Sequence, residues 1–117
     1  MAEDAAVATI DFFRLADGDE FERAIGDSAL YLGSLTLEEH YALQDVFGTA
    51  WNEGVPWVDP IKTTRLTYWQ AAHLLSLLEA YKPQRAAHAS RAVIAIKLVA
   101  ILRPAVQAGD GVLVIGP

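Results

Sequence analysis

The residues of this sequence best suited to chemistry surround one histidine. Positions 40, 44, 47 and 51 fall on one strip of a helix and hold His40, Gln44, Phe47 and Trp51. Trp51 leads into a loop that carries two further candidates. Aromatic walls with a few polar groups are typical of small-ligand pockets, and a histidine with a pKa of about 6.5 can act as acid or base. The candidate ligand-binding residues are therefore His40, Gln44, Trp51, Trp57 and Asp59.

The same residues also have a purely structural interpretation, which we favour because aromatic side chains mostly serve packing and interfaces. In that interpretation His40 is a boundary histidine, hydrogen-bonded to Gln44 or to the backbone, and Trp51 and Trp57 hold the loop in place. A pocket requires that solvent can reach His40, whereas a scaffold requires that the tryptophan rings are packed.

A second candidate site is basic. Arg85, His88 and Arg91 follow Lys82 at intervals of three and could contact an acidic partner, together with Lys62 and Arg65. At helical geometry this spacing covers half of the helix surface rather than one line. A solvated helix face is the alternative that we favour, because scattered surface charge is normal.

Several kinds of chemistry are excluded by what the sequence lacks. It has no cysteine, no glycine-rich phosphate loop, no nucleophile elbow and no His-Glu-x-x-His pair. Each histidine lacks a histidine or carboxylate partner three or four residues away, so no local helical metal site can form. We therefore expect no catalytic residue, no metal and no cofactor.

The charge is distributed unevenly. The net charge is −6, but residues 1–53 hold 12 acidic and two basic residues, whereas residues 54–117 hold three acidic and seven basic residues. An acidic chain is poorly suited to nucleic acid. We expect the two halves to attract each other in the fold, with an electrically polar molecule as the alternative.

Length and hydropathy predict one domain, residues 1–117, placed in the cytoplasm. The longest apolar run, residues 92–102, is too short to cross a bilayer and is interrupted by Lys97. The first residues are acidic, unlike the basic start of a signal peptide. Hydrophobic residues make up 53% of the chain, a surplus that favours burial against another subunit.

Caps and apolar spacing predict helices along most of the chain. Glycine, proline and capping residues delimit them. We expect a first helix over residues 3–16, with a strand over residues 7–15 as the alternative, and a second helix over residues 19–32 with Gly33 as its C-cap. A third helix is expected over residues 36–51, and a fourth from Asp59 or Thr67 to Tyr81. The last helix is expected over residues 84–103, with Ala92–Leu102 as its most buried part. Pro104 is expected to kink or end the last helix.

The fold class that follows is all-α: a compact bundle of four to six helices. Val112–Ile115 can form a short strand-like tail, and the sequence does not decide whether it does.

The function that we expect is that of a small acidic, non-catalytic protein-binding module of the inhibitor or immunity type, because acidic surfaces can fill basic active sites. The alternative is a small-ligand-binding protein or small enzyme that uses the pocket near His40, Trp51 and Trp57. A DNA-binding helix-turn-helix protein is disfavoured. We also expect a homodimer, formed through the last helix or the C-terminal tail.

Overall fold

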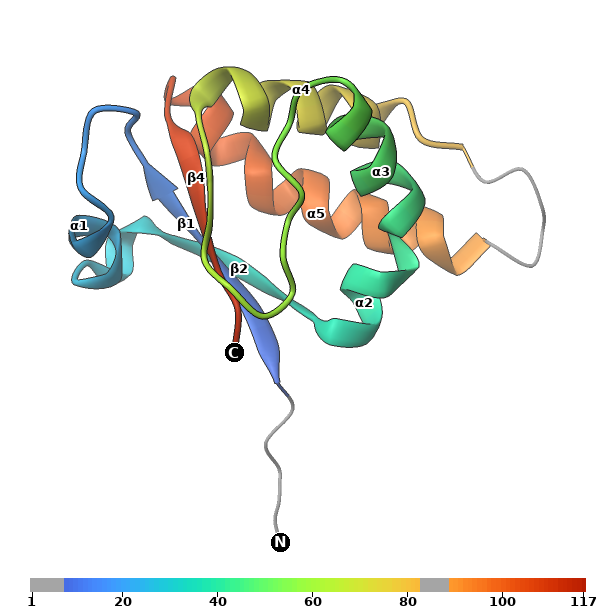
Figure 1. Cartoon of the computed structure of the whole chain (residues 1–117), viewed down its shortest axis with the longest axis horizontal. Coiled ribbons are helices and arrows are strands. Elements are labelled where there is room, and N and C mark those ends of the chain that lie inside the picture. Colours follow the sequence, from blue (N-terminus) through green and yellow to red (C-terminus); the bar gives the residue numbers. More distant parts are fainter. Residues whose placement is uncertain (1–7, 83–88) are drawn as a thin grey trace, which may run out of the picture.

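The structure is a computed structural model that describes residues 8–82 and 89–117, and it is a mixed α/β fold rather than the predicted all-α bundle (Figure 1). Four strands form one antiparallel sheet. In chain order the elements are β1 (Thr9–Leu15), α1 (Phe21–Ile25), the 3-10 turn η1 (Ser28–Leu30), β2 (Tyr31–Thr36), α2 (Leu37–Ala42), α3 (Gln44–Asn52), β3 (Thr64–Leu66), α4 (Tyr68–Glu79), α5 (Ala89–Gln107) and β4 (Gly111–Ile115).

The first predicted helix is wrong over its described part, and its strand alternative is right. β1 buries Ile10 and Phe12 on one face of the sheet, as period-two alternation requires. By the same alternation Phe13 and Leu15 lie on the opposite face, where they belong to a separate cluster. Because both faces of β1 carry apolar side chains, the sequence of this segment lacks the clean apolar–polar alternation that marks a strand.

The second predicted helix, residues 19–32, is also wrong. Only the five residues of α1 are α-helical, because Gly26 ends that helix and Asp27 starts η1 by accepting a hydrogen bond from the Ala29 amide at 2.9 Å. Gly33 is no C-cap but a residue of β2, at φ 146°. A Cβ there would lie 3.0 Å from Cγ1 of Ile101, so this glycine allows α5 to pack closely on the strand.

The strands lie in the order β2-β1-β4-β3, so the first and last strands of the chain form the centre of the sheet. Phe12 pairs with Gly33 on one side and with Val114 on the other, while Val112 pairs with Leu66 of β3. The strand-like tail left open by the sequence is therefore β4. It is not peripheral, because it holds β3 and β1 together.

The helix starts predicted from capping residues are confirmed at two positions. Thr36 and Glu39 form a capping box at the start of α2, and Thr67 and Gln70 form another at the start of α4. The predicted helix over residues 36–51 is interrupted at Leu43, which separates α2 from α3. The alternative helix start at Asp59 is wrong, because α4 begins at Tyr68.

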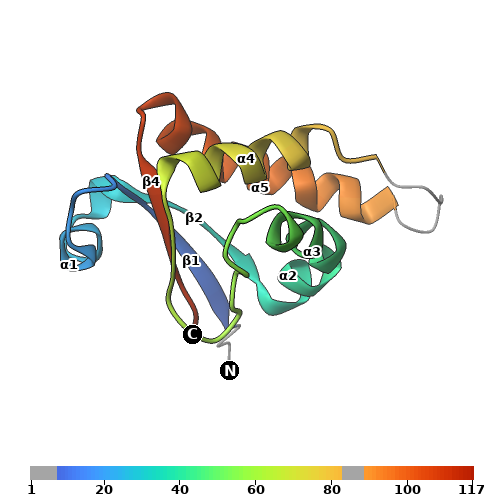
Figure 2. The same ribbon diagram turned by 45° about the horizontal axis from the view of Figure 1, so that its top comes forward.

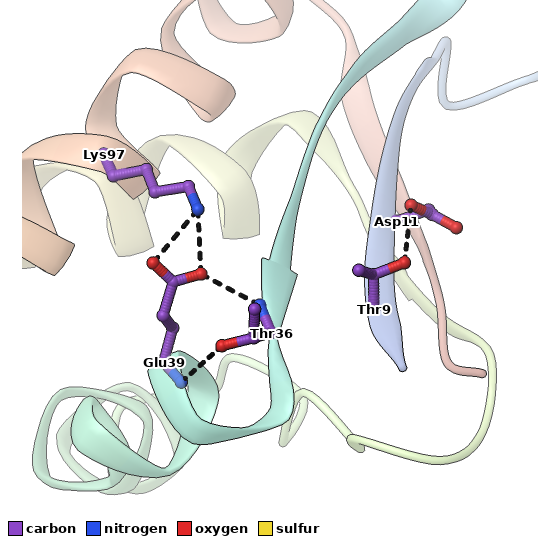
Figure 3. A network of polar contacts seen from close by, with 5 residues as sticks. All are labelled: Thr9, Asp11, Thr36, Glu39 and Lys97. Atoms are coloured by element: carbon purple, nitrogen blue, oxygen red, sulfur yellow. Dashed lines mark hydrogen bonds and ion pairs between the residues drawn. The ribbon is translucent and has the colours of Figure 1, made fainter. Parts of the chain in front are cut away.

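The capping box of α2 is connected to α5 (Figure 3). Glu39 accepts a hydrogen bond from the Thr36 amide at 2.9 Å, and its carboxylate oxygens lie 2.8 and 3.0 Å from Nζ of Lys97. Burial raises the pKa of Glu39, but Lys97 and the Thr36 hydrogen bonds outweigh it, so the net shift is downward. Figure 3 also shows Thr9 donating to Asp11 on β1, at 3.5 Å.

Helices α4 and α5 run side by side over one face of the sheet, with α2 and α3 beside them (Figures 1 and 2). Their main cluster includes Phe12, Leu35, Leu74 and Leu98, each with 0% exposed surface. A smaller cluster lies under α1 on the other face and joins Leu15, Ala24 and Leu113. Ion pairs join the two halves of the chain at Glu39–Lys97 and at Arg14–Asp110, and the contact between Glu53 and His73 also crosses between the halves.

The last helix departs from prediction in two ways. It extends beyond its predicted end at residue 103 and continues through Pro104 to Gln107, so the predicted end at Pro104 is wrong, whereas the alternative of a kink there stays a prediction. Its middle is not buried all round: Leu98 and Leu102 are fully buried, but Val93 is 67% and Ile96 69% exposed. Within the described residues, no helix is both long enough and apolar enough to cross a membrane.

Candidate functional site

His40, the residue at the centre of the predicted site, lies inside the protein. It has 0% exposed surface, and its Nε2 lies 2.7 Å from the carbonyl oxygen of Val58. The ring stacks on Phe47, with centroids 4.8 Å apart, and meets the edge of Tyr41 at 5.7 Å. Burial lowers the pKa of His40, against smaller opposite effects of the Val58 carbonyl and Asp59. His40 is therefore a neutral donor that holds the loop after α3, and solvent does not reach it.

The polar residues near His40 do not converge on one point. The Asp59 carboxylate accepts hydrogen bonds from the backbone amides of Ile61 at 2.8 Å and Lys62 at 3.1 Å, and these bonds lower its pKa. Its own amide donates to Oγ1 of Thr64. Gln44 is exposed at the start of α3. Asp59 thus stabilises its own turn, and Gln44 faces solvent.

The tryptophans, in contrast, gather around the C-terminal end of α3. Trp51 is 59%, Trp57 37% and Trp69 57% exposed. The Trp57 ring approaches the position of a Cβ on Gly48 to 4.0 Å, and Gly48 lies one turn before Trp51 on the same side of α3. Gly54, at φ 96°, approaches Trp69 equally closely, also at 4.0 Å.

A histidine and a carboxylate lie beside one of these rings. His73 follows Trp69 by one turn on α4, and the two rings stack in parallel, 5° apart in plane with centroids at 5.4 Å. Nε2 of His73 lies 2.6 Å from Oε1 of Glu53, the C-cap residue of α3. The side chains of His73 and Glu53 are 32% and 45% exposed. We call the set Trp51, Trp57, Trp69, Glu53 and His73 the tryptophan face.

Sequence reasoning found only part of this face. It singled out Trp51 and Trp57 but assigned no role to Trp69 or His73. Trp69 and His73 are four residues apart on a predicted helix, and this spacing alone predicts that their side chains are neighbours. The contact between Glu53 and His73 joins residues 20 apart on two different helices, and no local spacing predicts it.

The surroundings of the face are acidic. Residues 24–61 contain no lysine or arginine, and acidic residues recur from α2 through the loop after α3. They are Glu38, Glu39, Asp45, Glu53 and Asp59. Of these, Glu39 is neutralised by Lys97, whereas within residues 8–82 and 89–117 the ionic partner of Glu53 is a histidine, His73.

The predicted basic site falls largely outside the described residues and stays a prediction. Arg85 and His88 lie outside them, and Arg91 stands in the first turn of α5 near Tyr81. Arg65 is used structurally, because its Nη2 donates to the carbonyl oxygens of Ala16 at 2.8 Å and Asp17 at 2.9 Å. These contacts tie β3 to the turn after β1.

A second surface feature is a groove between α4 and α5, with a volume of about 540 Å³. Leu78, Ala92, Ala95, Ile96 and Val99 line it, and an ion pair of 2.7 Å joins Arg103 to Glu79 at its rim. The exposed Val93 lies next to it on α5. The groove is open, and its lining combines these apolar side chains with the polar groups of Glu79, Tyr81 and Arg103.

Within residues 8–82 and 89–117, no group of three or more histidine or carboxylate side chains is placed so that it could hold a metal ion.

Comparisons with known proteins found no match: no family model fits the chain, and no curated protein or solved structure is significantly similar to it.

Proposed function

We propose that this chain is a small, non-catalytic protein-binding module of the inhibitor or immunity type, and that it contacts its partner through the tryptophan face. The observation that carries the proposal is the exposure of Trp51 and Trp69, each by more than half of its surface. Tryptophan is enriched among the residues that dominate binding energy at protein interfaces. Exposed aromatic surface is otherwise unfavourable, so a partner that covers it explains it.

The rigidity of the face supports the same function. Trp57 and its loop are held by the His40–Val58 hydrogen bond and by the Asp59 turn, and Trp69 is held by its stack on His73. A surface that is already ordered loses less conformational entropy on binding. The acidic surroundings favour a partner with a basic contact surface.

The alternative is a small-ligand-binding protein or small enzyme. One observation favours it: the His73–Glu53 pair is accessible to solvent beside an aromatic ring. The pocket expected from the sequence, however, was centred on His40, which has 0% exposed surface. The protein-binding proposal uses all three tryptophans and does not need His40 to be reached.

Self-association belongs to the proposal as a second interaction. It is supported by Val93 and Ile96, two large apolar side chains that are 67% and 69% exposed on α5. A cytoplasmic location also remains part of the proposal, supported by the absence of cysteine from the sequence.

Affinity capture with matched variants tests the main proposal. The immobilised chain, Trp51→Ala, Trp69→Ala and the control Ile96→Ala are exposed to the same lysate, and retained proteins are identified by mass spectrometry. Ile96→Ala removes exposed apolar surface outside the tryptophan face. We expect one protein to be retained by the wild type and by Ile96→Ala, and its purified form to bind each tryptophan variant at least about 30-fold more weakly. Equal retention by all four proteins would contradict the proposal.

A further inference from the structure

Glu53 presents a carboxylate of which one oxygen is hydrogen-bonded and the other is available to a partner. Oε1 is bound to Nε2 of His73 at 2.6 Å, which fixes the orientation of the group. Within the described chain no hydrogen bond reaches Oε2, and the side chain is 45% exposed. The free oxygen can therefore accept hydrogen bonds from a partner without disturbing the pair.

Trp69 presents an aromatic surface directly beside this carboxylate. His73 stacks in parallel on its ring, yet Trp69 remains 57% exposed. Gly54 brings the backbone next to Glu53 to within van der Waals distance of the indole, since a Cβ there would lie 4.0 Å from it. The electron-rich ring surface attracts cations, and the adjacent carboxylate attracts the same charge.

Arginine is the side chain that satisfies both groups at once. Its guanidinium is planar, stacks on aromatic faces, is weakly hydrated and donates several hydrogen bonds in a fixed plane. Lysine offers a compact and strongly hydrated charge, which fits a flat ring less well. The absence of lysine and arginine from residues 24–61 leaves this part of the face without a cationic side chain of its own from α2, α3 or the following loop as far as Ile61.

We propose that Glu53, Trp69 and His73 form a receptor for an arginine side chain of the partner, with the guanidinium stacked on Trp69 and paired with Glu53. His73 acts here as a positioning residue, because it orients both the ring and the carboxylate. The inference rests on the proposed protein-binding function and names the chemistry of the partner's anchor residue.

The test uses small probes, because the partner is unidentified. The indole N–H signals of the labelled protein are followed by NMR during titration with N-acetyl-arginine amide, N-acetyl-citrulline amide and N-acetyl-lysine amide. Citrulline has nearly the same shape as arginine and no charge. We expect saturable shifts of the Trp69 signal with arginine in the millimolar range, at least about fivefold weaker binding of lysine, and no saturation with citrulline.

Variants then locate the site. We expect Glu53→Gln and Trp69→Leu each to weaken arginine binding at least about fivefold, whereas Glu22→Gln, an equal loss of charge at an exposed position of α1 outside the acidic surroundings of the face, leaves it unchanged. Thermal unfolding checks that each variant is folded, and the citrulline comparison needs no variant. The inference would be overturned by equal binding of arginine and citrulline, by an equal loss of arginine binding in Glu22→Gln, or by the absence of a Trp69 shift. None of those results would change the expected loss of partner binding in Trp51→Ala. Failure of this inference can therefore be distinguished from failure of the protein-binding function.

Discussion

His40 on α2 and Val58 in the loop after α3 are 18 residues apart and are joined by a hydrogen bond of 2.7 Å inside the protein. The bond closes the loop against α2, and Phe47 extends the contact by stacking on His40 and meeting the edge of Trp57 at 6.5 Å. Nδ1 of His40 is buried and has no hydrogen-bond partner among the residues that the structure describes. The tryptophan face therefore depends on a histidine that must stay neutral.

Acid should weaken this arrangement. Because burial lowers the pKa of His40 below its ordinary 6.5, the unfolded chain binds the proton more tightly than the folded protein. The free energy of unfolding keeps the full contribution of His40 above pH 6.5 and falls as the pH drops from 6.5 toward the lowered pKa. Glu39, whose pKa is lowered from 4.5, adds its own loss only at lower pH.

Urea unfolding of the wild type and of His40→Gln between pH 4.5 and 7.5 measures this effect. Glutamine can still donate a hydrogen bond to the Val58 carbonyl, but it cannot be protonated in this range. We expect a smaller decrease in stability on acidification for the variant than for the wild type. Parallel curves for the two proteins would show that His40 does not carry the pH dependence.

Gly33 should resist substitution. Its φ of 146° and the 3.0 Å distance from a Cβ to Ile101 predict that Gly33→Ala lowers the free energy of unfolding by about 2–4 kcal/mol. Gly18→Ala is the matched control, because a Cβ there meets nothing within 4 Å, and its effect should stay within about 0.5 kcal/mol. Similar unfolding midpoints for the two variants would mean that β2 and α5 are not packed as described.

The two sides of α5 should respond differently to truncation. Leu98 has 0% exposed surface and lies in the main core, so Leu98→Ala should destabilise the protein by about 2–5 kcal/mol. Ile96 is 69% exposed, and Ile96→Ala should change the stability of the monomer by no more than about 0.5 kcal/mol. Denaturant unfolding at low protein concentration separates these values; a large loss in both would place Ile96 in the core.

Association through α5 predicts a change in mass. We expect light scattering at high micromolar concentration to give about twice the monomer mass of 12.7 kDa, because pairing would cover Val93 and Ile96. Ile96→Glu should restore the monomer, whereas Trp51→Ala should not. A wild-type mass near 12.7 kDa would exclude the dimer at that concentration.

Local features of this protein were predictable from its sequence. The capping boxes at Thr36 and Thr67 involve residues three apart, and both helices begin there. The net charge, its uneven distribution and the absence of cysteine need no structure. Trp51 and Trp57 were also singled out, as walls of the predicted ligand pocket, because Trp51 shares a helical strip with His40 and Trp57 lies in the loop that follows.

The sheet and the site were decided only by tertiary structure. β1 is a strand because β2 and β4 supply its hydrogen bonds, and β4 joins it from the other end of the chain. The apolar spacing around Ile10 fits helix and strand alike until those partners are present. In the same way His40 becomes a buried donor only when Val58 returns to it, and Glu53 meets His73 only because α3 and α4 pack together. Contacts between distant segments carry no local periodicity, so they become visible only in the folded chain.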